Sequence, residues 1–185
     1  MEQKYSSANT SMNSSKLPAV YNKYQFNNGD RVLDYGCGKY TDHIKERMDE
    51  LGCEWFGYDK YNQPTEVNEE TKEQMKNKFD IGICSNVLNV IDSTDTIENI
   101  IHEIKDCCNT AVFYIYEGNQ SGNGSVTKDD CWQRNEKTDR YAELMRDMGY
   151  EPTVKGRMIT LKDELTLETV WVFQCSKTTK QRITK

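Results

Sequence analysis

The chain has 185 residues, of which 36% are hydrophobic and 29% are charged, and its formal net charge is −6. This length suits one domain with its own core, the apolar runs are too short to span a bilayer, and no signal peptide is expected. The negative net charge does not favour non-specific binding to nucleic acid or membranes. The seven cysteines lack paired spacing, which favours reduced thiols in a cytoplasmic protein without a metal site.

The chain before its first strand carries only weak structural signals. Residues 1–15 are rich in Ser, Asn and Thr and lack apolar periodicity, so we predict a disordered leader. Residues 16–25 place apolar side chains at helical spacing, which favours a short amphipathic helix. The Asn-Asn-Gly-Asp sequence at 27–30 is typical of a turn.

Strand and helix patterns alternate from residue 31 onward. Apolar runs and helical periodicity predict strands at 31–35, 54–58, 79–84 and 111–116 and helices at 41–51, 93–107 and 135–148. Between them, residues 60–78 are polar with a weak helical pattern, and residues 117–125 form a glycine-rich loop. Two further strands, 158–161 and 169–175, are expected to close the domain as an antiparallel pair.

This alternation predicts the fold class. Alternating strands and helices build a mostly parallel sheet with helices on both faces. We therefore expect an α/β, Rossmann-like domain over residues 16–176, with the antiparallel pair at its carboxyl-terminal end. Residues 177–185 carry four basic side chains and are expected to form a basic tail.

The first predicted strand ends in the most informative motif, Val-Leu-Asp-Tyr-Gly-Cys-Gly at residues 32–38. Gly36 and Gly38 let the backbone turn sharply and approach a ligand where a Cβ atom would collide with it. A pyrophosphate site requires a third glycine, which is absent, and Asp34 would repel a pyrophosphate. A carboxylate at this point suits the ammonium and sulfonium charges of S-adenosylmethionine instead.

The second predicted strand adds an independent signal, because it ends in an acid. A ribose site needs a carboxylate there, about twenty residues after the glycine turn, to accept hydrogen bonds from both hydroxyl groups. Asp59 occupies that position. The two motifs together predict that the cofactor is S-adenosylmethionine.

The motifs resemble those of class I S-adenosylmethionine-dependent methyltransferases. Residues 32–38 look like their first motif, residues 57–59 like their second, and residues 79–88 like their fourth strand and the segment after it. Residues 116–135 resemble a group of short methyltransferase-like proteins of bacteria and phages. The resemblance covers residues 17–175, and its specific motifs lie in the first half.

This resemblance implies a set of cofactor-binding residues. Asp34, Gly36 and Gly38 would line the methionine end, Asp59 would hold the ribose, and Lys60 would lie beside the adenine. Cys84, Ser85 and Asn86 would border the transferable methyl group. The family usually places a helix, a strand and a helix between its second motif and fourth strand, whereas only residues 60–78 are available here. We therefore expect the third strand to be missing or vestigial, without a clear counterpart for the acidic adenine contact.

The methyl acceptor is less constrained by the sequence. Enzymes that methylate exocyclic amines of DNA bases carry prolines after the fourth strand, which residues 85–88 lack. Cys84 lacks the preceding proline of a cytosine-C5 nucleophile, and Asp129-Asp130 alone does not make a metal site. These acceptor chemistries are therefore disfavoured.

Polar residues near the ends of the third and fourth predicted strands are the remaining candidates for substrate binding. Ligands of open α/β sheets gather beyond the carboxyl ends of the central strands. We therefore predict that the acceptor binds next to the following residues: Asn86, Asn89, Glu117, Asn119, Arg134 and Asn135. Arg134 carries a fixed fork that suits a phosphate or carboxylate.

Two functions follow from these observations. The first is methyl transfer to a small molecule, a nucleotide or a nucleic acid, although the net charge does not support a nucleic acid. The second is a catalytically silent module on the same fold that binds S-adenosylmethionine or another protein. The residues do not predict the oligomeric state.

Overall fold

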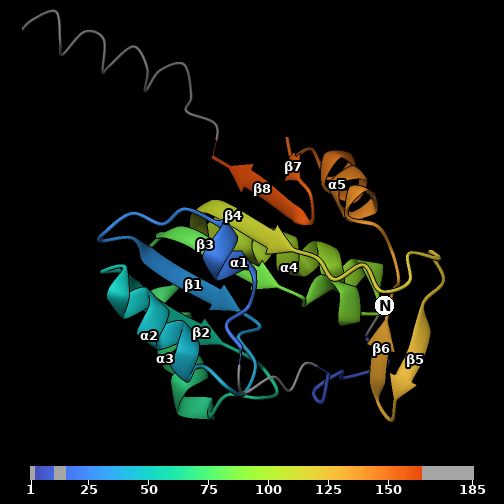
Figure 1. Cartoon of the computed structure of the whole chain (residues 1–185), viewed down its shortest axis with the longest axis horizontal. Coiled ribbons are helices and arrows are strands. Elements are labelled where there is room, and N and C mark those ends of the chain that lie inside the picture. The colour runs from blue at the N-terminus through green and yellow to red at the C-terminus, as the bar shows by residue number, and fades with distance from the viewer. Residues whose placement is uncertain (1–2, 11–15, 164–185) are drawn as a thin grey trace, which may run out of the picture.

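The computed structural model describes residues 3–10 and 16–163, which form one main sheet flanked by helices and a separate small hairpin (Figure 1). The strands are β1 (Arg31–Tyr35), β2 (Glu54–Tyr58), β3 (Phe79–Ser85), β4 (Cys108–Tyr114), β5 (Ser125–Lys128), β6 (Cys131–Gln133), β7 (Thr153–Lys155) and β8 (Met158–Lys162). The helices are α1 (Val20–Lys23), α2 (Asp42–Glu50), α3 (Thr65–Gln74), the 3-10 turn η1 (Leu88–Val90), α4 (Thr94–Cys107) and α5 (Thr138–Asp147).

The main sheet has the order β2-β1-β3-β4-β8-β7. Strands β2, β1, β3 and β4 are parallel, whereas β8 is antiparallel to β4 and β7 is antiparallel to β8. The predicted fold class, a mostly parallel α/β sheet with an antiparallel pair, is therefore confirmed. The two strands of the observed pair are β7 and β8, whereas the prediction paired residues 158–161 with residues 169–175. Residues 169–175 lie outside the described residues.

Helices cover the two faces of the sheet with separate apolar clusters. Helices α4 and α5 bury Ile97, Ile101 and Tyr141 against one face, and α1 and α2 bury Tyr21 and Met48 against the other. Burying an aliphatic side chain of this size stabilises the fold by about 1.5–3 kcal/mol. Because side chains alternate along a strand, β1 directs its odd-numbered residues towards the α4 face and its even-numbered residues towards the α1 face.

The described sheet ends at β2, and α3 leads directly into β3 where the usual fold has a third strand. The weak helical pattern in residues 60–78 thus corresponds to α3. The Thr71 hydroxyl fastens this helix to the sheet by donating to the Gly57 carbonyl oxygen at 2.9 Å. Within the described residues, β2 is therefore an edge strand, and no strand lies on its outer side.

Several element boundaries differ from the predictions for local reasons. Strand β4 begins at Cys108, because residues 108–110 pair with β3. Helix α5 begins only at Thr138, because Asn135 has a φ of 57° and lies in a turn. Helix α1 covers only four residues, since the backbone is extended from Tyr24 onward. Ser93 caps α4, because its side chain accepts a hydrogen bond from the Thr96 backbone.

The amino-terminal segment and the hairpin differ most from the sequence analysis. Strands β5 and β6 form a two-stranded sheet next to the predicted loop. Residues 3–10, which were expected to be disordered, lie next to this hairpin (Figure 1). The Tyr5 ring stacks on Trp132 at 5.5 Å between ring centroids. Composition did not predict this order because the polar segment is held by hydrogen bonds to distant parts of the chain.

Candidate cofactor-binding site

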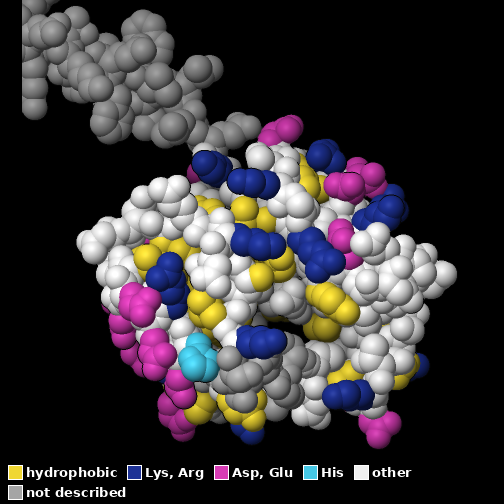
Figure 2. All heavy atoms as spheres, viewed as in Figure 1, with side chains coloured by type: hydrophobic (Ala, Val, Ile, Leu, Met, Phe, Trp, Pro, Cys, Tyr) yellow, Lys and Arg dark blue, Asp and Glu magenta, His cyan; other side chains and the backbone are white. Residues whose placement is uncertain are grey.

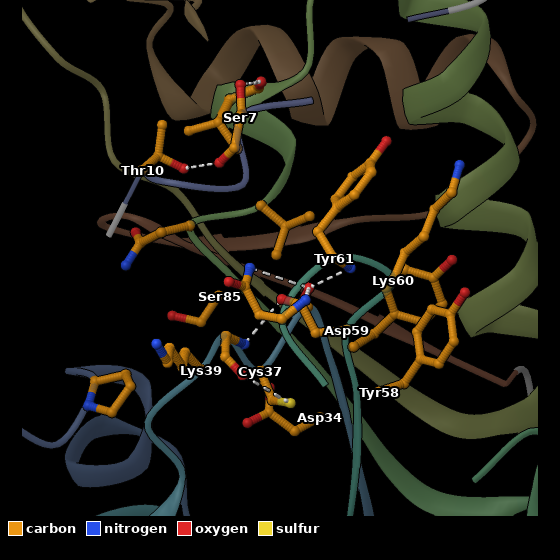
Figure 3. Close-up of a pocket in the computed structure, with 18 of the residues that line it drawn as sticks. Ser7, Thr10, Asp34, Cys37, Lys39, Tyr58, Asp59, Lys60, Tyr61 and Ser85 are labelled. Atoms are coloured by element: carbon orange, nitrogen blue, oxygen red, sulfur yellow. Dashed lines mark hydrogen bonds between the residues drawn. The ribbon is translucent and has the colours of Figure 1, made fainter. Parts of the chain in front are cut away.

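A cavity of about 570 Å³ lies beyond the carboxyl ends of β1, β2 and β3 (Figure 3). Figure 2 shows a hollow on this side of the molecule. The volume lies in the range of pockets that bind small molecules and cofactors. The parallel strands create this site because their carboxyl ends meet at one edge of the sheet.

The glycine turn forms the floor of the cavity. Gly36 and Gly38 have φ values of 80° and 76°, which side-chain-bearing residues rarely adopt. A Cβ atom at Gly36 would collide with the Val87 side chain, whereas a Cβ atom at Gly38 would meet no protein atom within 4 Å. Gly36 therefore permits close packing, and Gly38 borders open space in which a ligand fits.

Asp34 lies beside this turn and is 2% exposed. Burial raises the pKa of its carboxyl group to about 7, against the opposing effect of the neighbouring Tyr21 hydroxyl and Trp55 indole. Neither neighbour makes a hydrogen bond of normal geometry, and Asp34 Oδ2 has no partner among the described residues. A buried carboxylate oxygen without a hydrogen-bond partner is costly, so a cation placed beside it would be stabilised.

Two further buried oxygens at the cavity also lack partners within the described part of the chain. They are the Tyr21 hydroxyl and Ser85 Oγ. Buried polar atoms are normally hydrogen-bonded. Together with Asp34, these atoms provide a cluster of oxygens that suits a ligand with several N–H donors.

Asp59 connects the glycine turn to the loop after β2. Its Oδ2 accepts a hydrogen bond from the Gly38 backbone at 2.9 Å, and its Oδ1 accepts from the backbones of Tyr61 and Asn62, each at 2.9 Å. A carboxylate offers about four acceptor positions, so Oδ2, with one donor, keeps capacity for another. Asp59 thus shapes the turn and still presents an acceptor to the cavity (Figure 3).

The structure brings together seven of the eight predicted cofactor residues. The seven that line the cavity are Asp34, Gly36, Gly38, Asp59, Lys60, Ser85 and Asn86. Cys84 is the exception, because strand alternation directs it into the apolar cluster on the α4 face, where it is 1% exposed and burial raises the pKa of its thiol. Cys84 therefore does not line the cavity with the other predicted cofactor residues.

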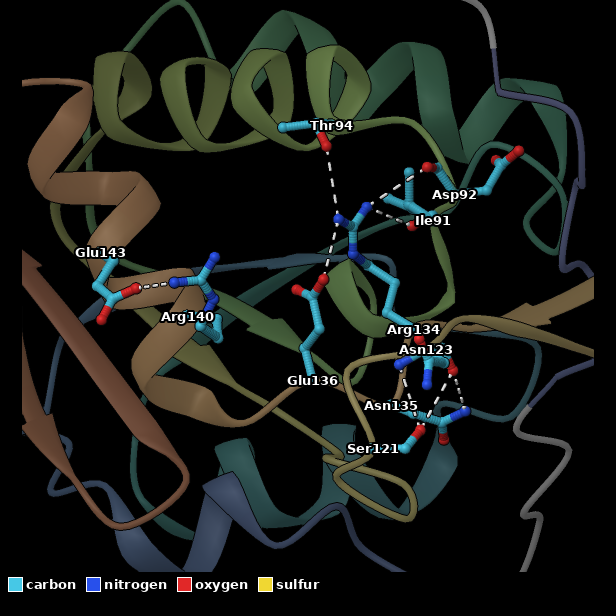
Figure 4. Close-up of polar contacts among 10 residues, drawn as sticks. All are labelled: Ile91, Asp92, Thr94, Ser121, Asn123, Arg134, Asn135, Glu136, Arg140 and Glu143. Atoms are coloured by element: carbon cyan, nitrogen blue, oxygen red, sulfur yellow. Dashed lines mark hydrogen bonds and ion pairs between the residues drawn. The ribbon is translucent and has the colours of Figure 1, made fainter.

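The residues predicted to bind the acceptor lie elsewhere. Of that group only Asn86 lines the cavity, whereas Asn89, Glu117, Asn119, Arg134 and Asn135 do not. Asn89 Nδ2 donates to Gln133 Oε1 at 3.1 Å, and Arg134 donates to the carbonyl oxygens of Ile91 and Asp92 at 3.3 and 3.4 Å (Figure 4). Arg134 also pairs with Glu136 at 3.4 Å. Asn89 and Arg134 therefore join η1 to the hairpin.

The other predicted acceptor residues stabilise the loop before α5. Glu117 Oε1 accepts from the Thr138 backbone and hydroxyl at 2.8 and 2.9 Å, which caps α5. Asn135 Nδ2 donates to the Asn123 carbonyl oxygen at 3.0 Å (Figure 4), and Asn135 Oδ1 accepts from the Asn119 backbone. In the structure, Glu117, Asn119 and Asn135 thus take part in hydrogen bonds within the protein.

Parts of the cavity wall were not identified from the sequence. Tyr21 appeared only as an apolar position of a helix, although a phenol on an apolar face often carries a polar function. Val87 and Val90 follow the third predicted strand, but valine is an ordinary core residue and does not by itself indicate a ligand site. Residues 6–8 and Thr10 also line the cavity, and nothing in their sequence indicated this.

The described residues contain no group of three or more side chains arranged to hold a metal ion. No helix in the same part of the chain is both long and apolar enough to cross a membrane.

No protein-family model matches the chain, and no curated protein matches it. Its fold is similar to a magnesium protoporphyrin IX methyltransferase from Synechocystis PCC 6803 with bound SAH, at a TM-score of 0.50 and 15% identity, covering 73% of this chain and 74% of that one. It is also similar to a cyclopropane-fatty-acyl-phospholipid synthase-like protein from Lactobacillus casei ATCC 334, at a TM-score of 0.50 and 12% identity, covering 73% and 66%. The likeness shows the class I methyltransferase fold.

Proposed function

We propose that this chain, which has the class I methyltransferase fold, binds S-adenosylmethionine in the cavity and transfers its methyl group to a small molecule, a nucleotide or a nucleic acid. One observation carries the proposal: the carboxylate of Asp34 is buried beside an open glycine turn, and its Oδ2 has no hydrogen-bond partner among the described residues. A cation with several N–H donors satisfies this carboxylate, and the α-ammonium group of S-adenosylmethionine is such a cation.

The rest of the cavity fits the other parts of the cofactor. The free capacity of Asp59 Oδ2 suits a ribose hydroxyl, as the resemblance implies. The space above Gly38 accommodates the methionine chain, and Val87, Val90 and Ile91 offer apolar surface to the adenine ring. In this arrangement Asp34 on β1 holds the ammonium end of the cofactor, and Asp59, directly after β2, holds the ribose.

The chemistry requires little from the protein beyond positioning. When bound, S-adenosylmethionine supplies an electrophilic methyl group on its sulfonium, and the acceptor attacks in line. Ser85 and Asn86 lie at the end of β3 and border the cavity, so they orient the groups near the methyl carbon. Asn86 has a φ of 58°, and its backbone N–H fixes this conformation by donating to the Tyr114 carbonyl oxygen at 2.7 Å.

Binding and transfer are tested separately. Calorimetric titration of the purified protein with S-adenosylmethionine is expected to show saturable binding, and Asp34→Asn, which keeps the shape but removes the charge, is expected to abolish it. Incubation with isotope-labelled cofactor and cell extract, followed by mass spectrometry, detects the methylated acceptor. Absence of binding by the wild-type protein would overturn the proposal. Binding without transfer to any extract fraction would instead support the silent binding module.

A further inference from the structure

Residues 3–10 run from the β5–β6 hairpin, where Tyr5 stacks on Trp132, to the loop that follows β2, the edge strand of the described sheet. Gln3, Ser6, Ser7, Ala8 and Thr10 from this segment line the cavity. Ser7 is only 6% exposed. In Figure 3, Ser7 and Thr10 lie on the opposite side of the site from Asp34. The segment is therefore part of the cavity wall.

The segment is anchored on the η1 and hairpin side by backbone and side-chain hydrogen bonds. Ser7 Oγ donates to the Val90 carbonyl oxygen at 2.7 Å and accepts from the Trp132 backbone at 3.1 Å. The Ser7 backbone donates to the Asp130 carbonyl oxygen at 2.8 Å, and Ser6 donates to the Asp130 carboxylate from its backbone and hydroxyl. These bonds hold Ser7 at a φ of 52°, which non-glycine residues seldom adopt.

The other end of the segment is anchored beside the predicted ribose carboxylate. Asn62 Nδ2 donates to the Ala8 carbonyl oxygen at 3.2 Å and to Asp59 Oδ1, also at 3.2 Å. One side chain thus joins the segment to the acid that ends β2. A turn closed by the Thr10 hydroxyl, which donates to the Ser7 carbonyl oxygen at 2.6 Å, keeps this part compact.

We propose that Ser6, Ser7, Ala8 and Thr10 bind the adenosine half of S-adenosylmethionine and replace the wall that the third strand provides in the usual fold. This inference rests on the proposed function. With the ammonium group at Asp34 and the ribose at Asp59, the segment next to Asn62 covers the nucleoside and not the methionine chain. The base lies between this segment and the apolar side chains after β3, and it leaves only when the segment moves.

Two variants release the segment in different ways. Deletion of residues 1–10 removes it, and Ser7→Pro breaks its anchor, because proline has no N–H and cannot adopt a positive φ. Asn9→Ala is the matched control, since Asn9 lies in the same turn but is exposed and does not line the cavity. Circular dichroism and thermal unfolding establish that each protein is folded, and Ser7→Pro decides the question if the deletion is not.

The ligands are S-adenosylmethionine, S-adenosylhomocysteine and 5′-methylthioadenosine, which keeps the nucleoside but lacks the amino acid. Releasing the segment is expected to weaken all three by the same factor, at least about tenfold, the loss of roughly one well-formed contact. Dissociation of S-adenosylhomocysteine, measured by stopped flow, is expected to accelerate by a similar factor, while Asn9→Ala behaves as wild type.

The outcomes separate this inference from the proposed function. If the wild-type protein binds none of the ligands, both are overturned. If it binds them and the released variants bind as tightly and dissociate as slowly, only the role of this segment is overturned. The same holds if the variants lose S-adenosylmethionine but keep the wild-type affinity for 5′-methylthioadenosine, because the segment would then not contact the nucleoside.

Discussion

Gly38→Ala is expected to abolish cofactor binding at a small cost in stability. An alanine at the φ of 76° found there costs about 1–2 kcal/mol of backbone strain. Its methyl group would meet no protein atom within 4 Å, so no steric cost within the protein is added. For a chain of this size, that strain corresponds to a fall in melting temperature of about 2–8 °C. The methyl group does, however, enter the space assigned to the cofactor.

Gly29→Ala provides a matched control for the backbone strain. Gly29 has a φ of 88°, and a Cβ atom there also meets nothing within 4 Å. It precedes β1 and so lies at the opposite end of that strand from the cavity, which it does not line. The two variants are therefore expected to lose similar amounts of stability, while only one of them changes the site.

Thermal unfolding with and without S-adenosylmethionine, followed by calorimetry, checks both expectations. Gly29→Ala should keep the wild-type dissociation constant, and Gly38→Ala should weaken binding at least about 100-fold, which corresponds to ~2.7 kcal/mol. A folded Gly38→Ala protein that binds the cofactor as tightly as Gly29→Ala would refute the assignment of the turn. The cavity would then bind its ligand without approaching the backbone at Gly38.

Three further predictions concern charge, a cap and a hydroxyl group. Because burial raises the pKa of Asp34 to about 7, above the value of about 3.9 in an unfolded chain, the unfolding free energy should fall as pH rises from about 4 to 7. Asp34→Asn should remove this part of the pH dependence. Binding of S-adenosylmethionine to the wild-type protein should release a proton, and its affinity should rise from pH 5.5 to 7. Calorimetry in several buffers checks both expectations about binding. Glu117→Ala should cost about 0.5–2 kcal/mol by uncapping α5 and leave cofactor affinity unchanged, which chemical denaturation and titration would check. Ser85→Ala should weaken cofactor binding without lowering the melting temperature, because its hydroxyl has no partner in the described protein.

The first half of the fold was predictable because its signals are local. Each parallel strand is a short apolar run followed by a turn, and α4 shows an apolar stripe at helical spacing that is fully buried at Ile101 and Ile104. The two acids proposed to hold the cofactor could be placed from the sequence for the same reason, since Asp34 lies at the end of β1 and Asp59 directly follows β2. Parallel strands then bring these ends to one edge, so topology alone assembles that part of the site.

The remainder depended on contacts between distant segments, which a single sequence does not display. Polar residues after β3 and β4 were predicted to bind substrate because amides and acids in such loops require partners. The structure supplies those partners from the protein itself: Glu117 finds the first turn of α5, and Asn89 finds Gln133. An unusual polar residue therefore indicates a ligand only after its possible protein partners have been counted. By that measure Asp34 remains the strongest candidate, because its buried Oδ2 has no hydrogen-bond partner among the described residues.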